Sequence, residues 1–322
     1  MSSEKLSVEL SKGVNGLEEI ILREVYLYGG RVTSWKNEHG EELLFVSSRA
    51  LFKPSKAIRG GIPIRFPQFS NHGSLQSHGF ARNRFWSIDP DPPTSPKKFI
   101  HYEFRLRVAL GLGGDLMLTS RIRNTNTDGK PFTFAFAYHT YFSVSDISEV
   151  RVEGLGTLDY LDNLQNKERF TEQGDAITFE TEVDRIYLSA PTKIAILDHE
   201  KKRTFAIRKD GLPDAGEEGH LKRKKFEMNS ELRLGFLPVP VDIPNSLVWN
   251  PWDKKAKALA VFGDDEYKHM LCVETVAVEK PITLKPGEEW RGRQELCAVP
   301  SSYCGGLLDA RKVLQCAEKM HY

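Results

Sequence analysis

The stretch FTFAFAYHTYF, residues 132–142, decides the fold that this sequence predicts. Large aromatic side chains occupy every second position from Phe132 to Tyr138, while Thr, Ala and finally His139 fill the positions between them. A period of two is typical of a β-strand, because successive side chains of a strand point to opposite faces of the sheet. We expect the aromatic face to pack into a core and the small residues to leave room beside His139.

The same period recurs on both sides of this stretch. Residues 102–108 and 116–122 alternate around Gly113-Gly114-Asp115, which predicts a β-hairpin. Further strands are predicted at residues 19–28, 193–198, 204–209, 270–278 and 294–299. Because strands follow strands without helices between them, we expect an all-β fold of antiparallel sheets packed face to face, with few short helices.

The length of 322 residues is compatible with a single β domain over residues 1–322. Two segments depart from the β pattern. Residues 216–247 join a basic cluster to an apolar run punctuated by prolines, which predicts an irregular insertion: a functional lid, a flexible insertion, or an error in the sequence such as a retained intron. Residues 305–322 are expected to form a C-terminal tail or helix, with the best helical pattern at 309–320.

Charge and hydropathy exclude several classes of partner. The chain has 45 Lys and Arg residues against 44 Asp and Glu residues, so no overall field attracts nucleic acid or an anionic membrane. The N-terminus MSSEKLSVELSKG lacks the apolar core of a secretory signal, and no run of about 18 apolar residues occurs. The four cysteines lack paired metal-type spacing. We expect a soluble, cytoplasmic monomer that binds neither nucleic acid nor a membrane.

Two residues are candidates for proton transfer. His139 ends the small-residue face of its strand, where it can act as a general acid or simply be a hydrogen-bonded core histidine. Glu274 lies in the apolar strand MLCVETVAV, residues 270–278. A carboxylate there faces solvent, pairs with a cation, or occupies a cleft where its pKa is shifted.

Arginines gather in two neighbouring stretches, RGGIPIRFPQF at residues 59–69 and LQSHGFARNRFW at residues 75–86. The charged and titratable members are Arg59, Arg65, His78, Arg82 and Arg84. Glycines allow close approach of the backbone to a ligand, and the guanidinium fork matches phosphate oxygens, so the cluster is a candidate anion site. The alternative is a solvated loop with ordinary surface arginines, in which Arg65 points elsewhere.

Seven short segments match one known family in order. They are RGGIP (59–63), FPQF (66–69), QSHGFAR (76–82), AYHTYF (137–142), VDRIY (183–187), VWNPWDKKAK (248–257) and CVETVAVEKP (272–281). Together they resemble the plant-type glucose-6-phosphate 1-epimerases of the aldose 1-epimerase superfamily, from about residue 7 to residue 304. The main departure is the segment at 216–247, because in the family the chain runs almost directly from KDGLPDA into VVWNPW.

The resemblance implies a galactose-mutarotase-like β-supersandwich with the sugar site on a concave sheet face. It further implies an isomerase that interconverts the α and β anomers of glucose 6-phosphate by acid–base ring opening and reclosure, without a metal or cofactor. In that reaction His139 would protonate the ring oxygen, and Glu274 would remove the proton from the anomeric hydroxyl.

The resemblance also implies substrate-binding roles outside the proton-transfer pair. Arg59 and Arg82 would hold the phosphate, His78 the ring-oxygen side or a hydroxyl, and Asp184 the sugar hydroxyls. Two alternatives remain: an aldose 1-epimerase acting on free sugars, which needs no phosphate-facing arginines, and a non-catalytic sugar-phosphate binding protein.

Overall fold

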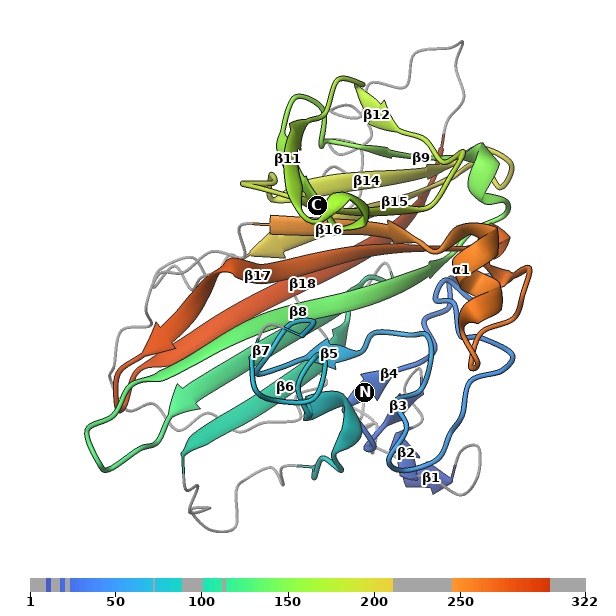
Figure 1. Ribbon diagram of the computed structural model, residues 1–322. Helices are drawn as coiled ribbons and strands as arrows, with labels where there is room; N and C mark the ends of the chain where they lie inside the picture. Colours follow the sequence, from blue (N-terminus) through green and yellow to red (C-terminus); the bar gives the residue numbers. More distant parts are fainter. Residues whose placement is uncertain are drawn as a thin grey trace.

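The computed structural model describes residues 10–12, 18–20, 24–71, 73–88, 101–111, 114–210 and 245–301, the first two stretches by their backbone alone. Two seven-stranded antiparallel sheets packed face to face dominate these residues (Figure 1). The first, called the site sheet below, runs in the order β11 (Glu168–Thr171), β10 (Asp159–Asp162), β13 (Val183–Tyr187), β16 (Asn245–Asn250), β17 (Met270–Leu284), β8 (Phe132–Ser143) and β5 (Ile64–Arg65).

The second sheet, called the back sheet, has the order β12 (Ala176–Ile177), β9 (Val150–Glu153), β14 (Lys193–Asp198), β15 (Arg203–Asp210), β18 (Glu289–Pro300), β7 (Leu116–Asn124) and β6 (Tyr102–Leu110). A small third sheet joins β1 (Leu10–Lys12), β2 (Glu18–Ile20), β3 (Val25–Tyr26) and β4 (Arg31–Val32). The long strands β8, β17 and β18 cross the middle of the molecule (Figure 1).

Helices are few among the described residues. One α-helix, α1 (Trp252–Ala258), follows β16 directly. Short 3₁₀ turns complete the set: η2 (Ala81–Asn83), η3 (Ile147–Glu149), η4 (Asn163–Gln165) and η5 (Glu266–His269). The expected all-β fold of face-to-face antiparallel sheets is therefore confirmed.

The aromatic face of β8 packs between the sheets, as its alternation predicts. Phe134, Phe136 and Tyr138 are buried there, with Trp290 of β18 against both phenylalanine rings at centroid distances of 5.7 and 4.8 Å. The Tyr138 hydroxyl donates to Ser120 Oγ of β7 at 2.7 Å, so its polar end is satisfied inside the core. The opposite face of β8, which carries Ala137 and His139, is consequently turned away from the back sheet.

Most predicted strands are present, with shifted ends. The hairpin of β6 and β7 is confirmed, and residues 193–198 coincide with β14. The single strand expected at 19–28 is wrong: β2 ends at Ile20, β3 begins at Val25, and Glu24 before it has a left-handed backbone with φ of 59°. Helix α1 was not predicted, because seven residues of WDKKAKA are too few for a helical period to show.

The insertion expected at 216–247 needs a new boundary. Residues 245–247 belong to β16, where Leu247 and Val248 continue a buried apolar run. Residues 216–244 and the tail from 302 onward, including the helix expected at 309–320, lie outside the described residues.

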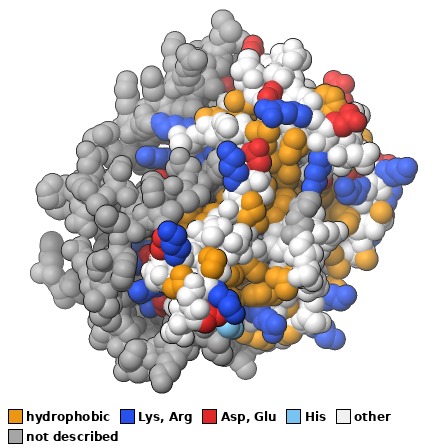
Figure 2. Space-filling model, turned by 60° about the vertical axis from the view of Figure 1, so that its left-hand side comes forward, with side chains coloured by type: hydrophobic (Ala, Val, Ile, Leu, Met, Phe, Trp, Pro, Cys, Tyr) orange, Lys and Arg blue, Asp and Glu red, His pale blue; other side chains and the backbone are white. Residues whose placement is uncertain are grey.

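Charges of both signs are interspersed over the face of the molecule drawn in Figure 2. Lysine and arginine side chains alternate there with aspartate and glutamate, between patches of hydrophobic atoms (Figure 2). This mixture agrees with the formal net charge of +1. The described part of that face therefore offers no extended basic surface to a polyanion.

Candidate active site

His139 and Glu274 lie directly opposite each other on β8 and β17. Their side chains are only 2% and 1% exposed, and His139 Nδ1 contacts Glu274 Oε1. Opposed residues of an antiparallel pair point to the same face, so both occupy the face turned away from the back sheet. Glu274 is therefore not the solvent-facing strand residue that remained possible from the sequence.

A buried chain of hydrogen bonds holds β8 and β17 together on the side of the site sheet that faces the back sheet. Thr140 and Thr275 each follow a member of the pair and point the other way, into the core. Gln294 of β18 donates to Thr140 Oγ1 and accepts from Thr275 Oγ1, both at 2.8 Å. Because one side chain ties both strands to the back sheet, the register that brings His139 beside Glu274 is fixed by a fully satisfied polar chain.

The far nitrogen of the His139 ring lies beside a thiol. Nε2 is 3.4 Å from the Sγ atom of Cys272, which is buried on the same face of β17. Burial raises the pKa of the Cys272 thiol well above its usual value, so the thiol keeps its proton. Burial, followed by the charge of Arg65, lowers the pKa of His139. A neutral ring with its proton on Nδ1 gives each nitrogen a suitable partner.

Glu274 has a raised proton affinity. Burial raises the pKa of its carboxyl to about 8, against the opposing effect of Arg65 and with a further contribution from Asp184. Arg65 Nη1 lies 3.2 Å from Glu274 Oε2. Arg65, which from the sequence could have pointed elsewhere, is thus part of the site. A carboxyl that titrates near neutral pH is suited to gaining and losing a proton during catalysis.

Arg59 and Arg82 lie in the same region, together with Arg31. Arg59 Nη1 donates to the Tyr141 hydroxyl at 3.2 Å, and the Tyr141 ring packs edge-on to His139 with a centroid distance of 4.5 Å. Arg82 Nη2 donates to the Ser77 carbonyl at 2.9 Å, and its buried Nε has no partner. Arg31, which the sequence patterns did not single out, donates to the Gly60 carbonyl at 3.1 Å.

These three arginines share an unusual electrostatic situation. Within the described part of the chain, no carboxylate pairs with Arg31, Arg59 or Arg82. Burial, with a contribution from neighbouring guanidiniums, lowers the pKa of Arg31 to about 9 and that of Arg82 to about 10. All three remain charged at neutral pH; Arg31 is buried and Arg59 and Arg82 are half-buried, and charges withdrawn from water without counterions are costly. An anionic ligand would supply the missing charge.

His78 faces this cluster in its neutral form. The backbone N–H of Ser70 donates to His78 Nδ1 at 3.0 Å, which leaves the ring proton on Nε2. Burial, followed by Arg65, Arg82 and Arg59, lowers the pKa of His78 to about 2. The ring can therefore donate one hydrogen bond from Nε2 without adding another charge to the cluster.

Asp184 lies on the other side of the pair formed by His139 and Glu274. It is opposite Trp249 in the pairing of β13 with β16, and the Trp249 ring is 5.9 Å from that of His139. Asn163 Nδ2 donates to Asp184 Oδ1 at 2.7 Å, while burial raises the pKa of this carboxyl. The sequence singled out neither Trp249 nor Tyr141, although both lie inside the quoted motifs.

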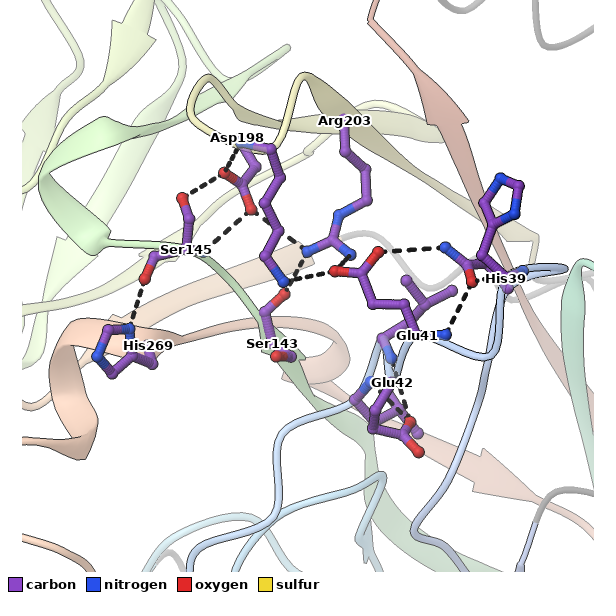
Figure 3. A network of polar contacts seen from close by, with 12 residues as sticks. His39, Glu41, Glu42, Ser143, Ser145, Asp198, Arg203 and His269 are labelled. Atoms are coloured by element: carbon purple, nitrogen blue, oxygen red, sulfur yellow. Dashed lines mark hydrogen bonds and ion pairs between the residues drawn. The ribbon is translucent and has the colours of Figure 1, made fainter.

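A second buried polar network contrasts with the site because its charges are paired. Arg203 lies between Asp198 and Glu41, with Nη2 to Asp198 Oδ2 at 3.3 Å and Nη1 to Glu41 Oε1 at 3.0 Å (Figure 3). Ser145 and the Ser143 carbonyl complete the hydrogen bonds (Figure 3). This network holds strand ends together, and its buried arginine is already paired with carboxylates of the protein.

The described residues include one group with donor atoms close enough to bind a metal ion: Asp115, directly before β7, with Glu295 and Cys297 of β18. Burial, followed by the charge of Asp115, raises the pKa of the Cys297 thiol, so this sulfur retains its proton. The group is also on the other sheet from His139 and Glu274.

No helix among the described residues is long and apolar enough to cross a membrane.

The family model described as "Aldose 1-epimerase" matches residues 21–215 and 241–297. These two ranges contain every site residue described above. The residues between the ranges, 216–240, fall within the segment expected to be an insertion.

Relatives and solved structures agree with this match. A protein of Cenchrus ciliaris named "Putative glucose-6-phosphate 1-epimerase" is 62% identical over 334 residues, covering 95% of this chain and 92% of the relative. The crystal structure of a "putative mutarotase (YeaD)" from Salmonella typhimurium aligns with a TM-score of 0.62 at 22% identity, covering 91% and 97% of the two chains. The galactose mutarotase related enzyme of Lactobacillus acidophilus aligns with a TM-score of 0.60 at 14% identity, covering 94% and 100%. The expected galactose-mutarotase-like fold is thereby confirmed.

Proposed function

The chain belongs to the aldose 1-epimerase family, and from this premise we propose that it is an isomerase that interconverts the α and β anomers of glucose 6-phosphate. The name carried by the Cenchrus ciliaris relative supports this substrate. The buried pair of His139 and Glu274 beside three arginines supports it independently.

The observation that carries the proposal is the direct contact of His139 with Glu274. Ring opening of a pyranose requires a proton to leave the anomeric hydroxyl and another to reach the ring oxygen. Both oxygens are bonded to the same carbon, C1. An acid and a base that serve them at once must therefore lie side by side, as these two residues do.

One proton belongs to the pair throughout the cycle. In the free site this proton belongs to Glu274 and His139 is neutral, whereas in the reacting state it lies on His139. Glu274, now a carboxylate, takes the proton of the C1 hydroxyl, while the His139 imidazolium gives its proton to the ring oxygen as the C1–O5 bond breaks. The aldehyde rotates about C1–C2, and the reverse transfers close the ring on the other face of C1. The raised pKa of Glu274, about 8, allows the carboxyl to hold this proton between the two steps.

Arg59 and Arg82 would bind the phosphate, with the charge of Arg31 behind them. A phosphate dianion offers the negative charge that this cluster lacks among the described residues. Free glucose would leave the guanidiniums unpaired, so the cluster favours the phosphorylated sugar. His78 and Asp184 would then hydrogen-bond the sugar ring from the two sides of the catalytic pair.

The test is anomer exchange, measured by two-dimensional exchange NMR on glucose 6-phosphate with free glucose in a parallel sample. Acceleration of exchange for the phosphate ester well above that for glucose is the expected result. Equal acceleration of both sugars would replace the proposal with a general aldose 1-epimerase. Folded protein that binds glucose 6-phosphate without accelerating exchange would replace it with a binding protein.

We also infer that the protein acts in the cytoplasm as a monomer. Its two described cysteines, Cys272 and Cys297, are free thiols, which suits a reducing compartment. Light scattering coupled to size-exclusion chromatography tests the monomer, and fractionation of cells tests the location.

A further inference from the structure

Arg65 reaches Glu274 by crossing a strand. In the site sheet β8 lies between β5, which carries Arg65, and β17, which carries Glu274. Arg65 is opposite Ala137, and Glu274 is opposite His139, two residues further along β8. All four side chains share one face. The methyl group of Ala137 leaves the space through which the longer side chain passes.

Two contacts hold the guanidinium in this position. Its Nη1 atom lies 3.2 Å from Glu274 Oε2, and its central carbon lies 5.0 Å from the centroid of the buried Phe69 ring. Stacking on an aromatic face restricts the orientation of the planar fork. Because Oε2 is engaged by Arg65, the other oxygen, Oε1, is the one turned toward His139.

Side chains from several strands set the electrostatic environment of Glu274. His139 faces it from β8, Cys272 lies beside it on β17, and Asp184 acts from β13. The residue opposite it on β16 is Leu247, which has no charge. Burial and Asp184 raise the pKa of Glu274, and Arg65 is the cation that acts against them.

We propose that Arg65 is a positioning residue, which favours the ionised form of Glu274 and turns its Oε1 atom toward His139, where the reacting sugar would lie. This inference rests on the proposed function, because it assigns Arg65 the task of preparing the base of that reaction. The proposal gives Arg65 a different role from Arg59 and Arg82. The guanidinium of Arg65 binds a carboxylate of the protein, whereas the guanidiniums of Arg59 and Arg82 would bind the phosphate of the substrate.

The first experiment titrates Glu274 directly and needs no turnover. Protein labelled with ¹³C at the glutamate carboxyl is followed by NMR from pH 6 to pH 10.5, and Glu274→Gln identifies the signal. Loss of a neighbouring cation disfavours the carboxylate, so the midpoint in Arg65→Met should rise by about one pH unit or more. In Arg65→Lys, which restores the charge, the midpoint should lie between the two. An unchanged midpoint in folded Arg65→Met would overturn the proposal.

The second experiment measures glucose 6-phosphate exchange by the same variants over the same pH range. Arg65→Met should move the alkaline limb of kcat to higher pH and, because the ionised form of Glu274 becomes rarer, lower kcat at pH 7 by about tenfold or more, with KM changed less than about threefold. A rise in KM at unchanged kcat would assign Arg65 to phosphate binding instead. If the wild-type protein does not accelerate anomer exchange, the proposed function is refuted. The NMR titration would still show whether Arg65 sets the pKa of Glu274.

Arg185→Met is the matched control. Arg185 forms an arginine–glutamate pair with Glu172 at 3.0 Å that is more exposed than the pair of Arg65 with Glu274, and it follows Asp184 on β13, so it points away from the site. Removal of this pair should leave both the midpoint of Glu274 and the alkaline limb of kcat at their wild-type values. Thermal unfolding of each variant establishes that the compared proteins are folded.

Discussion

Lys209 donates a hydrogen bond from Nζ to the backbone carbonyl of Asn245 at 3.0 Å. The described chain leaves β15 at Asp210 and resumes in β16 at Asn245, so this bond brings together the two ends of residues 211–244. Each of the two sheets has seven strands among the described residues. The connection therefore needs only to be long enough to pass from the back sheet to the site sheet.

Deletion of residues 216–240 should leave a folded and active protein. The connection shortens from 34 residues to 9, and the smaller loop-closure entropy should stabilise the fold by about 1 kcal/mol at most. Urea unfolding and glucose 6-phosphate exchange measure the two effects. A deleted protein that folds but exchanges more than about tenfold slower would show that the segment takes part in the site.

Substitution of either catalytic residue should abolish most of the exchange. We expect Glu274→Gln and His139→Ala each to lower kcat by about 10²- to 10⁴-fold with little change in KM, because each removes one proton transfer. The double variant should be hardly slower than the worse single one. His101→Ala, at an exposed histidine, is the control. Retained activity in either single variant would contradict the assigned roles.

Loss of Arg59 or Arg82 should act on binding of the phosphate. Arg59→Met and Arg82→Met are expected to raise KM for glucose 6-phosphate by about 10- to 100-fold, since each removes a charge-assisted hydrogen bond. Inorganic phosphate should compete with the substrate in the wild type and much less in the variants. Arg84→Met, two residues from Arg82 but exposed, should bind normally. Unaltered KM in both site variants would place the phosphate elsewhere.

The pH dependence of exchange should report the loss of the proton that His139 and Glu274 share. Burial raises the pKa of Glu274 to about 8 and lowers that of His139, so the pair keeps one proton up to about pH 8, and kcat/KM for the wild type should be level below that value and fall above it. Each pH unit above the midpoint should cost about tenfold in rate. Spontaneous exchange is subtracted at every pH. A rate that instead rises toward pH 8 would mean that the reaction needs the ionised Glu274 alone, without a proton on His139.

The paired network around Arg203 should matter for stability alone. Arg203→Met leaves the buried carboxylate of Asp198 without its cation and should lower the free energy of unfolding by about 3 kcal/mol. Lys201→Met removes an exposed contact with Glu41 from the same network and should cost about 1 kcal/mol or less. Both variants should keep wild-type kcat per folded molecule, as measured by denaturant unfolding together with exchange.

Strand positions can be predicted well from the sequence, because the alternation of apolar and polar or small residues along a strand is visible in the sequence itself. The alternation at 132–142 shows both which face is buried and that His139 lies on the other face. It cannot show which strand lies opposite, so the contact of His139 with Glu274, 135 positions apart in the chain, came only from the resemblance. Arg65 and Arg31 illustrate the limit: each is an arginine in an apolar stretch, and only the register of neighbouring strands shows what its guanidinium reaches.

The crossing of Arg65 over Ala137 links two positions that evolution cannot change independently. A larger residue at position 137 would occupy the space through which the arginine reaches β17, and Glu274 would lose its cation although neither catalytic residue had changed. Among related sequences, arginine at position 65 should accordingly coincide with alanine or glycine at position 137. Bulky residues at 137 should appear only in lineages that carry a shorter residue at 65, and such lineages must prepare their base by other means.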